Sequence, residues 1–196
     1  MVKTSTVLCC AILAGAAHAA GPIVVIVGPP GSGRTTQAQM LHKDLGLPVI
    51  TADDLIRANP QKFQKNRLPT MQGVEPHLDP AMNDLVEQAL VATDLSKGVV
   101  LDGYPASKIQ GDFLASLRQK LELDRATIIH LEAADNVVRK RLKGDKGRDV
   151  EQELKDYHRE FDFLKTYFPD ANIRPVDATK PIAEVAKEIR AILQSH

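Results

Sequence analysis

The stretch "PIVVIVGPPGSGRTT", residues 22–36, joins a continuous apolar run to a glycine-rich turn. An uninterrupted run of β-branched residues is typical of a strand that is covered on both faces. The segment "RTTQAQMLHKDLG" (34–46) follows, with Ala38, Leu41 and Leu45 at helical spacing and Gly46 as a natural terminator. This part of the sequence therefore predicts a buried strand, a tight turn and a helix in direct succession.

The rest of the chain repeats this alternation of short apolar runs and helical segments. Further strands are predicted at 47–50, 97–105, 125–133 and 171–179. Helices are predicted near 52–58, 80–95, 106–121, 134–143, 150–167 and 181–194. Strands that alternate with helices indicate an α/β fold with a five-stranded, parallel, doubly wound sheet. Ligands of such sheets bind beyond the carboxyl ends of the strands, where the irregular segments 59–79 and 143–149 are expected to form the rim.

Length and charge narrow the class of protein. With 196 residues, the chain is expected to form one domain beyond its N-terminal segment. Lys and Arg number 25, as do Asp and Glu, so the formal net charge is zero. This balance does not favour a nucleic-acid partner, and none is predicted. We expect a monomer.

The first 19 residues have the layout of a secretory signal peptide. Lys3 precedes an apolar stretch at 7–17, and the small-x-small triplet at 17–19 predicts cleavage after Ala19. The apolar stretch is shorter than the roughly 20 residues that span a bilayer, so no stable membrane anchor is expected after cleavage. The mature domain, 20–196, is therefore predicted to be periplasmic or secreted. The alternative is a misassigned start codon and a cytoplasmic protein.

Both cysteines of the chain, Cys9 and Cys10, lie inside the predicted signal peptide. The mature domain would contain none. It could then form no disulfide bond and bind no metal through a thiolate.

The glycine-rich turn nearly matches the phosphate-loop pattern G-x-x-x-x-G-K-[ST]. Gly28, Gly33 and Thr35 fit the pattern, and Arg34 replaces its lysine. Glycines let successive backbone N–H groups point inward, and together with a helix N-terminus these groups form an anion site. The Thr35 hydroxyl and Asp102, at the end of the predicted strand "VVLD", are candidate ligands of Mg²⁺. The alternative is a tight turn without a ligand.

Arg34 keeps the positive charge of the pattern's lysine but not its shape. A guanidinium is a planar fork, whereas an ammonium is a compact point charge. We therefore expect Arg34 to hold the β- and γ-phosphates in a different geometry, with binding preserved and the rate reduced.

Three motifs, "GPPGSGRTTQAQML", "TADDLIR" and "VVLDGYPAS", occur in that order. With them the chain resembles the adenylate kinase / nucleoside monophosphate kinase family over residues 21–193. The resemblance implies a phosphate-loop fold with a nucleoside monophosphate (NMP)-binding segment at about 51–80 and a short lid at about 139–150. It also implies transfer of the ATP γ-phosphoryl group to a nucleoside monophosphate, most simply AMP, with Mg²⁺ as the cofactor of ATP.

The resemblance assigns expected roles to individual residues. The ATP-binding residues are Gly28, Pro29, Gly31, Ser32, Gly33, Arg34, Thr35, Thr36 and Arg141. The NMP-binding residues are Asp54, Arg57, Gly103, Tyr104, Pro105 and Gln110. The metal ligands are Thr35 and Asp102, and the catalytic residues are Arg34, Asp102 and Arg148.

Several positions depart from the family pattern. Ala52 and Asp53 stand where the family usually has Thr and Gly, and Ala106 stands where it usually has an arginine for the acceptor phosphate. Glu153 occupies the approximate position of a second lid arginine. These departures leave two alternatives open: an exported nucleotide-binding protein with weak or no turnover, and a related phosphate-loop kinase of small molecules with another acceptor.

Overall fold

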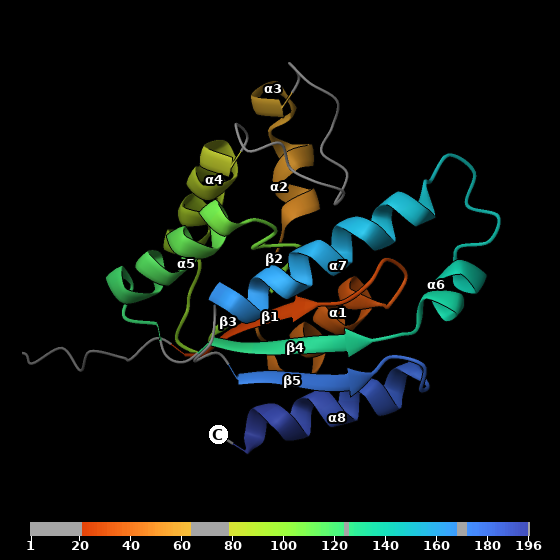
Figure 1. The fold of residues 1–196 in the computed structure, drawn as a ribbon. Coiled ribbons are helices and arrows are strands. Elements are labelled where there is room, and N and C mark those ends of the chain that lie inside the picture. Colours follow the sequence, from red (N-terminus) through yellow and green to blue (C-terminus); the bar gives the residue numbers. More distant parts are fainter. Residues whose placement is uncertain (1–20, 64–78, 124–125, 168–171, 196) are drawn as a thin grey trace, which may run out of the picture.

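The computed structural model describes residues 21–63, 79–123, 126–167 and 172–195, and all five predicted strands form (Figure 1). They are β1 (Ile23–Val27), β2 (Val49–Thr51), β3 (Val99–Asp102), β4 (Ala126–Glu132) and β5 (Asn172–Asp177). Their order in the sheet is β2-β3-β1-β4-β5, and each neighbouring pair is parallel. The predicted five-stranded parallel sheet is therefore confirmed.

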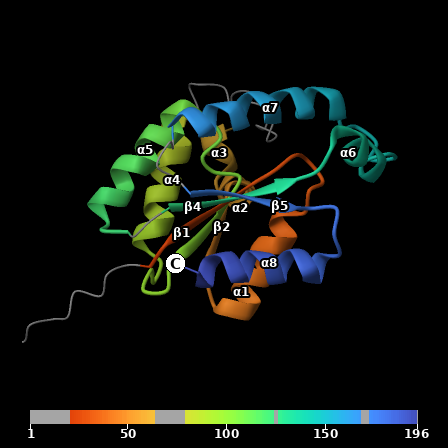
Figure 2. The same cartoon turned by 60° about the horizontal axis from the view of Figure 1, so that its bottom comes forward.

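Helices cover both faces of the sheet. They are α1 (Arg34–Leu45), α2 (Ala52–Ala58), α3 (Pro60–Phe63), α4 (Asp79–Val91), α5 (Lys108–Lys120), α6 (Asp135–Arg141), α7 (Val150–Tyr167) and α8 (Ile182–Gln194). Figure 2 shows α1 and α8 on one side of the sheet and α4, α5 and α7 on the other. This two-sided covering is the doubly wound arrangement predicted from the sequence. No helix among the described residues is long and apolar enough to span a membrane.

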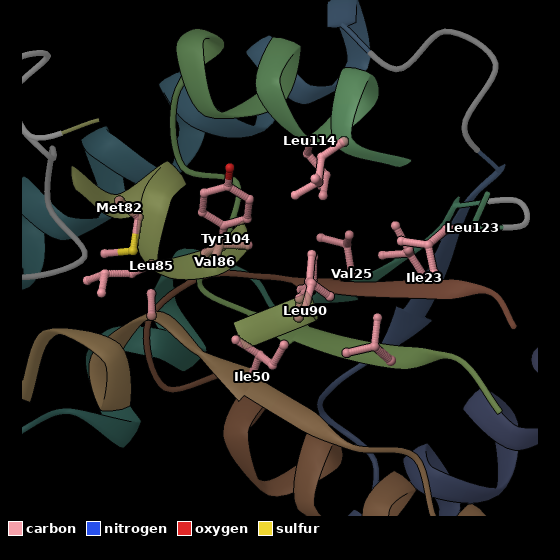
Figure 3. Packing of buried hydrophobic residues seen from close by; sticks show 14 of the residues in the cluster. Ile23, Val25, Ile50, Met82, Leu85, Val86, Leu90, Tyr104, Leu114 and Leu123 are labelled. Atoms are coloured by element: carbon pink, nitrogen blue, oxygen red, sulfur yellow. The ribbon is translucent and has the colours of Figure 1, made fainter. Parts of the chain in front are cut away.

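The core consists of two apolar layers that share the sheet. Along β1, Ile23, Val25 and Val27 face one layer, and Val24 and Ile26 face the other. The first layer receives side chains from α4 and α5; Figure 3 shows Leu90 and Leu114 near Val25, and Met82, Leu85 and Val86 farther along, on the side of Tyr104. The second layer receives residues of α1 and α8, namely Ala38, Leu41, Val185 and Ile189. Burial on both faces explains why the strand sequences are continuously apolar.

The carboxyl ends of β1 and β3 lie side by side. Ile26 pairs with Asp102 in the parallel register, so the turn after β1 starts next to Asp102. The strand predicted at 97–105 is shorter than expected because Gly103 takes a positive φ of 77°, which ends the extended backbone. The fold therefore brings the glycine-rich turn and Asp102 to one edge of the sheet.

The amino end of the sheet is closed by a tight approach of two backbone segments. The N–H of Gly21 donates to the Leu95 carbonyl at 2.8 Å, and a Cβ on Gly21 would lie 2.3 Å from the Gly98 nitrogen. Only glycine fits there. The predicted signal peptide, residues 1–19, lies outside the described residues.

Candidate functional site

The turn after β1 has the backbone of an anion-binding loop. Gly31 and Gly33 have φ values of 70° and 95°, and the Ser32 N–H closes a turn on the Pro29 carbonyl at 3.1 Å. Gly33 is the N-cap of α1 and offers no side chain to the N–H groups of the first turn. Nothing lies within 4 Å of a Cβ built on Gly33. Uncapped N–H groups beside open space are the arrangement that receives a phosphate.

Gly28 holds the loop against the neighbouring strand. A Cβ built there would lie 2.7 Å from Ser32 Oγ and 2.8 Å from the Leu131 carbonyl oxygen of β4. Ser32 is 7% exposed, and its buried Oγ has no hydrogen-bond partner among the described residues. The loop is therefore packed closely on β4.

The Thr35 hydroxyl donates to Asp102 Oδ2 at 2.6 Å. Asp102 is 5% exposed, and its other oxygen, Oδ1, is buried without a partner within the described part of the chain. A hydroxyl and a carboxylate are oxygen ligands of the kind that Mg²⁺ prefers, and Mg²⁺ commonly binds one or two protein oxygens together with substrate phosphates. No cluster of three or more His, Cys, Asp or Glu residues suited to a metal occurs in the four described ranges. The pair therefore fits a magnesium ion that arrives with a nucleotide.

Arg34 begins α1 at the end of this loop and lies within electrostatic reach of α7. Burial raises the pKa of the Tyr157 hydroxyl, Glu132 adds to the rise, and the positive charge of Arg34 opposes it. Thr36 follows on the exposed side of the first turn of α1.

The side chain of Arg141, at the end of α6, donates hydrogen bonds to two backbone carbonyls, one of them in the glycine-rich loop. Its Nη1 donates to the Gly31 carbonyl at 3.2 Å and its Nη2 to the Ala178 carbonyl, just beyond β5, at 2.8 Å. A Cβ on Gly31 would lie 3.1 Å from the Leu142 side chain. The expected role of Arg141 in binding ATP stays a prediction, and its hydrogen bond to the Ala178 carbonyl was not predicted.

The expected acceptor residues on α2 form one exposed group. The Thr51 hydroxyl caps the helix, accepting from the Asp54 N–H at 3.0 Å and donating to Asp54 Oδ2 at 2.6 Å. Arg57 pairs with Asp54 Oδ1, and the hydrogen bonds from Thr51 and then Arg57 lower the pKa of Asp54. Both side chains are more than 60% exposed, at 71% for Arg57 and 66% for Asp54. Exposed ion pairs contribute little to stability, so Arg57 can leave Asp54 and bind an incoming phosphate instead.

The expected acceptor residues after β3 are largely enclosed. Gln110 is 1% exposed; its Oε1 accepts from the Ala106 N–H at 2.7 Å, and its Nε2 donates to Asp79 Oδ1 at 2.8 Å. The Tyr104 hydroxyl donates to Asn83 Oδ1 at 2.7 Å. Both ends of the Gln110 amide are thus hydrogen-bonded within the chain, and its expected role in binding the NMP stays a prediction. Gly103 and Pro105 form the turn that carries this group.

A pair that the sequence did not predict joins the segment between α6 and α7, where a lid is expected, to the first turn of α7. Arg148 donates from Nε to Glu153 Oε1 at 2.8 Å and from Nη2 to Oε2 at 2.5 Å. The Glu153 side chain is 5% exposed, and its hydrogen bonds are the main cause of the raised pKa of Arg148. Arg148, expected at the transferring phosphoryl group, is bound here by an acid of its own chain.

Comparison with known proteins places this geometry in a family. The family model for adenylate kinase matches residues 26–173. The chain belongs to the adenylate kinase family. It is 33% identical to the adenylate kinase of Mycolicibacterium vanbaalenii over 179 residues, which cover 86% of this chain and 98% of that protein. It is 30% identical to adenylate kinase 1 of a Nostoc species over 185 residues, which cover 88% of this chain and 98% of that protein.

Membership of the adenylate kinase family makes this chain a nucleotide-binding phosphotransferase of the nucleoside monophosphate kinase class. The matched range begins in β1 and includes the glycine-rich loop and the segments expected to bind the acceptor and to form the lid. The resemblance noted from the sequence is therefore confirmed at the level of the family.

Proposed function

We propose that this chain transfers the γ-phosphoryl group of ATP to AMP, producing two molecules of ADP. The observation that carries the proposal is the 2.6 Å contact between Thr35 and the buried carboxylate of Asp102 beside an uncapped glycine loop. The two relatives described above carry the name adenylate kinase, which supports AMP as the acceptor.

Each part of the site has a proposed task in this reaction. The loop N–H groups and Arg34 bind the β- and γ-phosphates, and Arg57 binds the phosphate of AMP. One oxygen of that phosphate attacks the γ-phosphorus in line, and the bond from the γ-phosphorus to the bridging oxygen of ADP breaks. No covalent intermediate with the protein is needed, because positioning and charge neutralisation supply most of the catalysis. Once Arg148 is released from Glu153, its guanidinium neutralises charge on the transferring phosphoryl group.

Thr35 and Asp102 are the residues proposed to hold Mg²⁺. The ion, when bound with ATP, would neutralise charge on the β- and γ-phosphate oxygens. Oδ1 of Asp102 has no partner among the residues that the structure describes, and this supports the assignment, since a buried carboxylate oxygen needs a cation or a donor.

The acceptor is tested by a coupled assay of ADP formation with ATP·Mg²⁺ and AMP, CMP, UMP or GMP in turn. We expect AMP to give the highest kcat/KM. A preference for another monophosphate would identify a related kinase, which the alanines at positions 52 and 106 leave open.

A second candidate function is nucleotide binding with little turnover. The observation that favours it is the bidentate pair between Arg148 and the buried Glu153, which withholds one lid arginine from the nucleotide. Tight binding of ATP in calorimetry, with no ADP formed from any acceptor, would support this candidate.

Replacing Arg34 by lysine tests the unusual loop cation. We expect Arg34→Lys to raise kcat about tenfold, because an ammonium follows the moving phosphoryl charge more closely than a planar fork, and a tenfold rate change needs only about 1.4 kcal/mol. Affinity for ATP should change little, since the charge is kept. The measurement is the coupled assay run on both proteins. An unchanged kcat would show that this position does not limit the rate.

We also propose that the protein is exported and cleaved after Ala19. The tripartite layout of residues 1–19 supports this. Expression of the full chain in a bacterium should give periplasmic or secreted protein whose N-terminus is Ala20, as read by mass spectrometry. Recovery of protein that still carries Met1 from the cytoplasmic fraction alone would contradict export.

A further inference from the structure

Each nitrogen of the Arg148 guanidinium is directed at a carboxylate of this chain. Nε and Nη2 donate to the two oxygens of Glu153, and Nη1 lies 3.4 Å from Asp145 Oδ2. Two parallel charged hydrogen bonds between one guanidinium and one carboxylate are among the strongest that side chains form. A phosphate that binds Arg148 in bidentate fashion through Nε and Nη2 must displace Glu153.

Glu153 cannot readily give up its partner. Its N–H donates to the Asp149 carbonyl at 2.9 Å, which places it in the first turn of α7, and its side chain is 5% exposed. A buried carboxylate that loses its cation keeps an uncompensated charge, which is strongly unfavourable. The neighbouring pair of Arg139 and Glu151 carries no such penalty, because its side chains are 46% and 62% exposed.

We propose that Glu153 is a positioning residue that restrains Arg148 and thereby limits phosphoryl transfer. The proposal rests on the function proposed above, in which Arg148 reaches the transferring phosphoryl group. A polyphosphate and Glu153 compete for one guanidinium, because both present anionic oxygens that arginine binds in bidentate fashion. Removing the charge of Glu153 shifts this competition toward the nucleotide.

The decisive variant is Glu153→Gln, which keeps the size of the side chain and removes its charge. We expect kcat with ATP·Mg²⁺ and AMP to rise at least about tenfold, a small part of what one well-placed arginine can supply. The affinity for ATP·Mg²⁺ in calorimetry should rise with it. The KM for AMP should stay within about twofold, because the freed arginine serves the donor phosphate.

Three further variants separate restraint from a general structural effect. Glu151→Gln makes the same change two residues earlier on α7 and breaks the pair with Arg139; it should leave both readouts unchanged. Glu153→Asp keeps the charge and should keep the low rate. Arg148→Ala combined with Glu153→Gln should abolish the gain. If Glu153→Gln does not fold by circular dichroism, Asp145→Asn, whose parent side chain is 51% exposed, should give a smaller gain of the same kind.

The two readouts distinguish failure of this inference from failure of the proposed function. If the wild type forms ADP but the folded Glu153→Gln variant gains neither rate nor affinity, the restraint is wrong and the kinase assignment stands. If no variant forms ADP but Glu153→Gln binds ATP more tightly through Arg148, the restraint is right and the kinase assignment is wrong. Absence of both effects overturns both.

Discussion

Replacing Asp102 by asparagine is expected to lower kcat about 100- to 1,000-fold, because a carboxylate that holds the nucleotide's metal supports several kcal/mol of transition-state stabilisation. Asparagine keeps an oxygen that can accept from the Thr35 hydroxyl, so the 2.6 Å contact can survive. The substitution also removes a buried charge whose Oδ1 has no partner among the described residues. We therefore expect the free energy of unfolding to change by less than about 1 kcal/mol.

The measurements are kcat at saturating ATP and AMP over a range of Mg²⁺ concentrations, together with thermal unfolding. Asp112→Asn is the matched control, because Asp112 pairs with Lys108 at 2.6 Å on the solvent-exposed side of α5, where its side chain is 56% exposed. It should keep full activity. An Asp102→Asn variant that retains more than a third of the wild-type kcat would remove Asp102 from the metal site.

Gly28→Ala is expected to damage both the stability of the fold and the binding of ATP. The added Cβ would lie 2.8 Å from the Leu131 carbonyl oxygen and 2.9 Å from the Leu131 Cβ, and the β4 backbone, paired with β1 on one side and β5 on the other, cannot move aside freely. Such overpacking typically costs about 1–3 kcal/mol of unfolding free energy. Relief of the clash displaces the loop, so affinity for ATP·Mg²⁺ should fall at least about tenfold, the effect of 1.4 kcal/mol.

Thermal unfolding and calorimetric titration with ATP·Mg²⁺ measure the two effects. Gly144→Ala is the control, because Gly144 has a φ of 106° but nothing lies within 4 Å of its Cβ position. In this variant only the positive φ disfavours alanine, which should lower the free energy of unfolding by about 1–2 kcal/mol. If Gly28→Ala binds ATP as well as Gly144→Ala does, the close approach of the loop to β4 does not shape the phosphate site.

The fold was predictable because its strands are buried on both faces and its helices are not. Continuous apolar runs such as Ile23–Val27 and helical spacing such as that of Ala38 and Leu41 reflect these two environments directly. The short helix α3 was missed, since it lies in a polar stretch and only Phe63, 1% exposed, anchors it in the core. Its packing depends on contacts far along the chain, which a local pattern does not contain.

The candidate site was predictable where it depends on strand ends. Asp102 ends β3, and Thr35 lies in the first turn of α1, after the loop that follows the neighbouring strand β1. The structure brings the two residues together. The orientation of Gln110 toward Asp79, 31 residues earlier, and the burial of Glu153 are tertiary effects. The resemblance to the family showed only that Glu153 stands near the position of a lid arginine. The structure shows in addition that Glu153 binds Arg148.

The close fit of Gly21 against Gly98 has a practical consequence for handling the protein. Because β1 runs from this contact toward the phosphate loop, a purification tag or surface attachment joined ahead of Gly21 departs from the opposite rim of the sheet. When the protein is immobilised in this way, the glycine-rich loop faces the buffer, which suits titrations on a sensor chip. Cloning scars should stop before Gly21, since any side chain there strikes backbone.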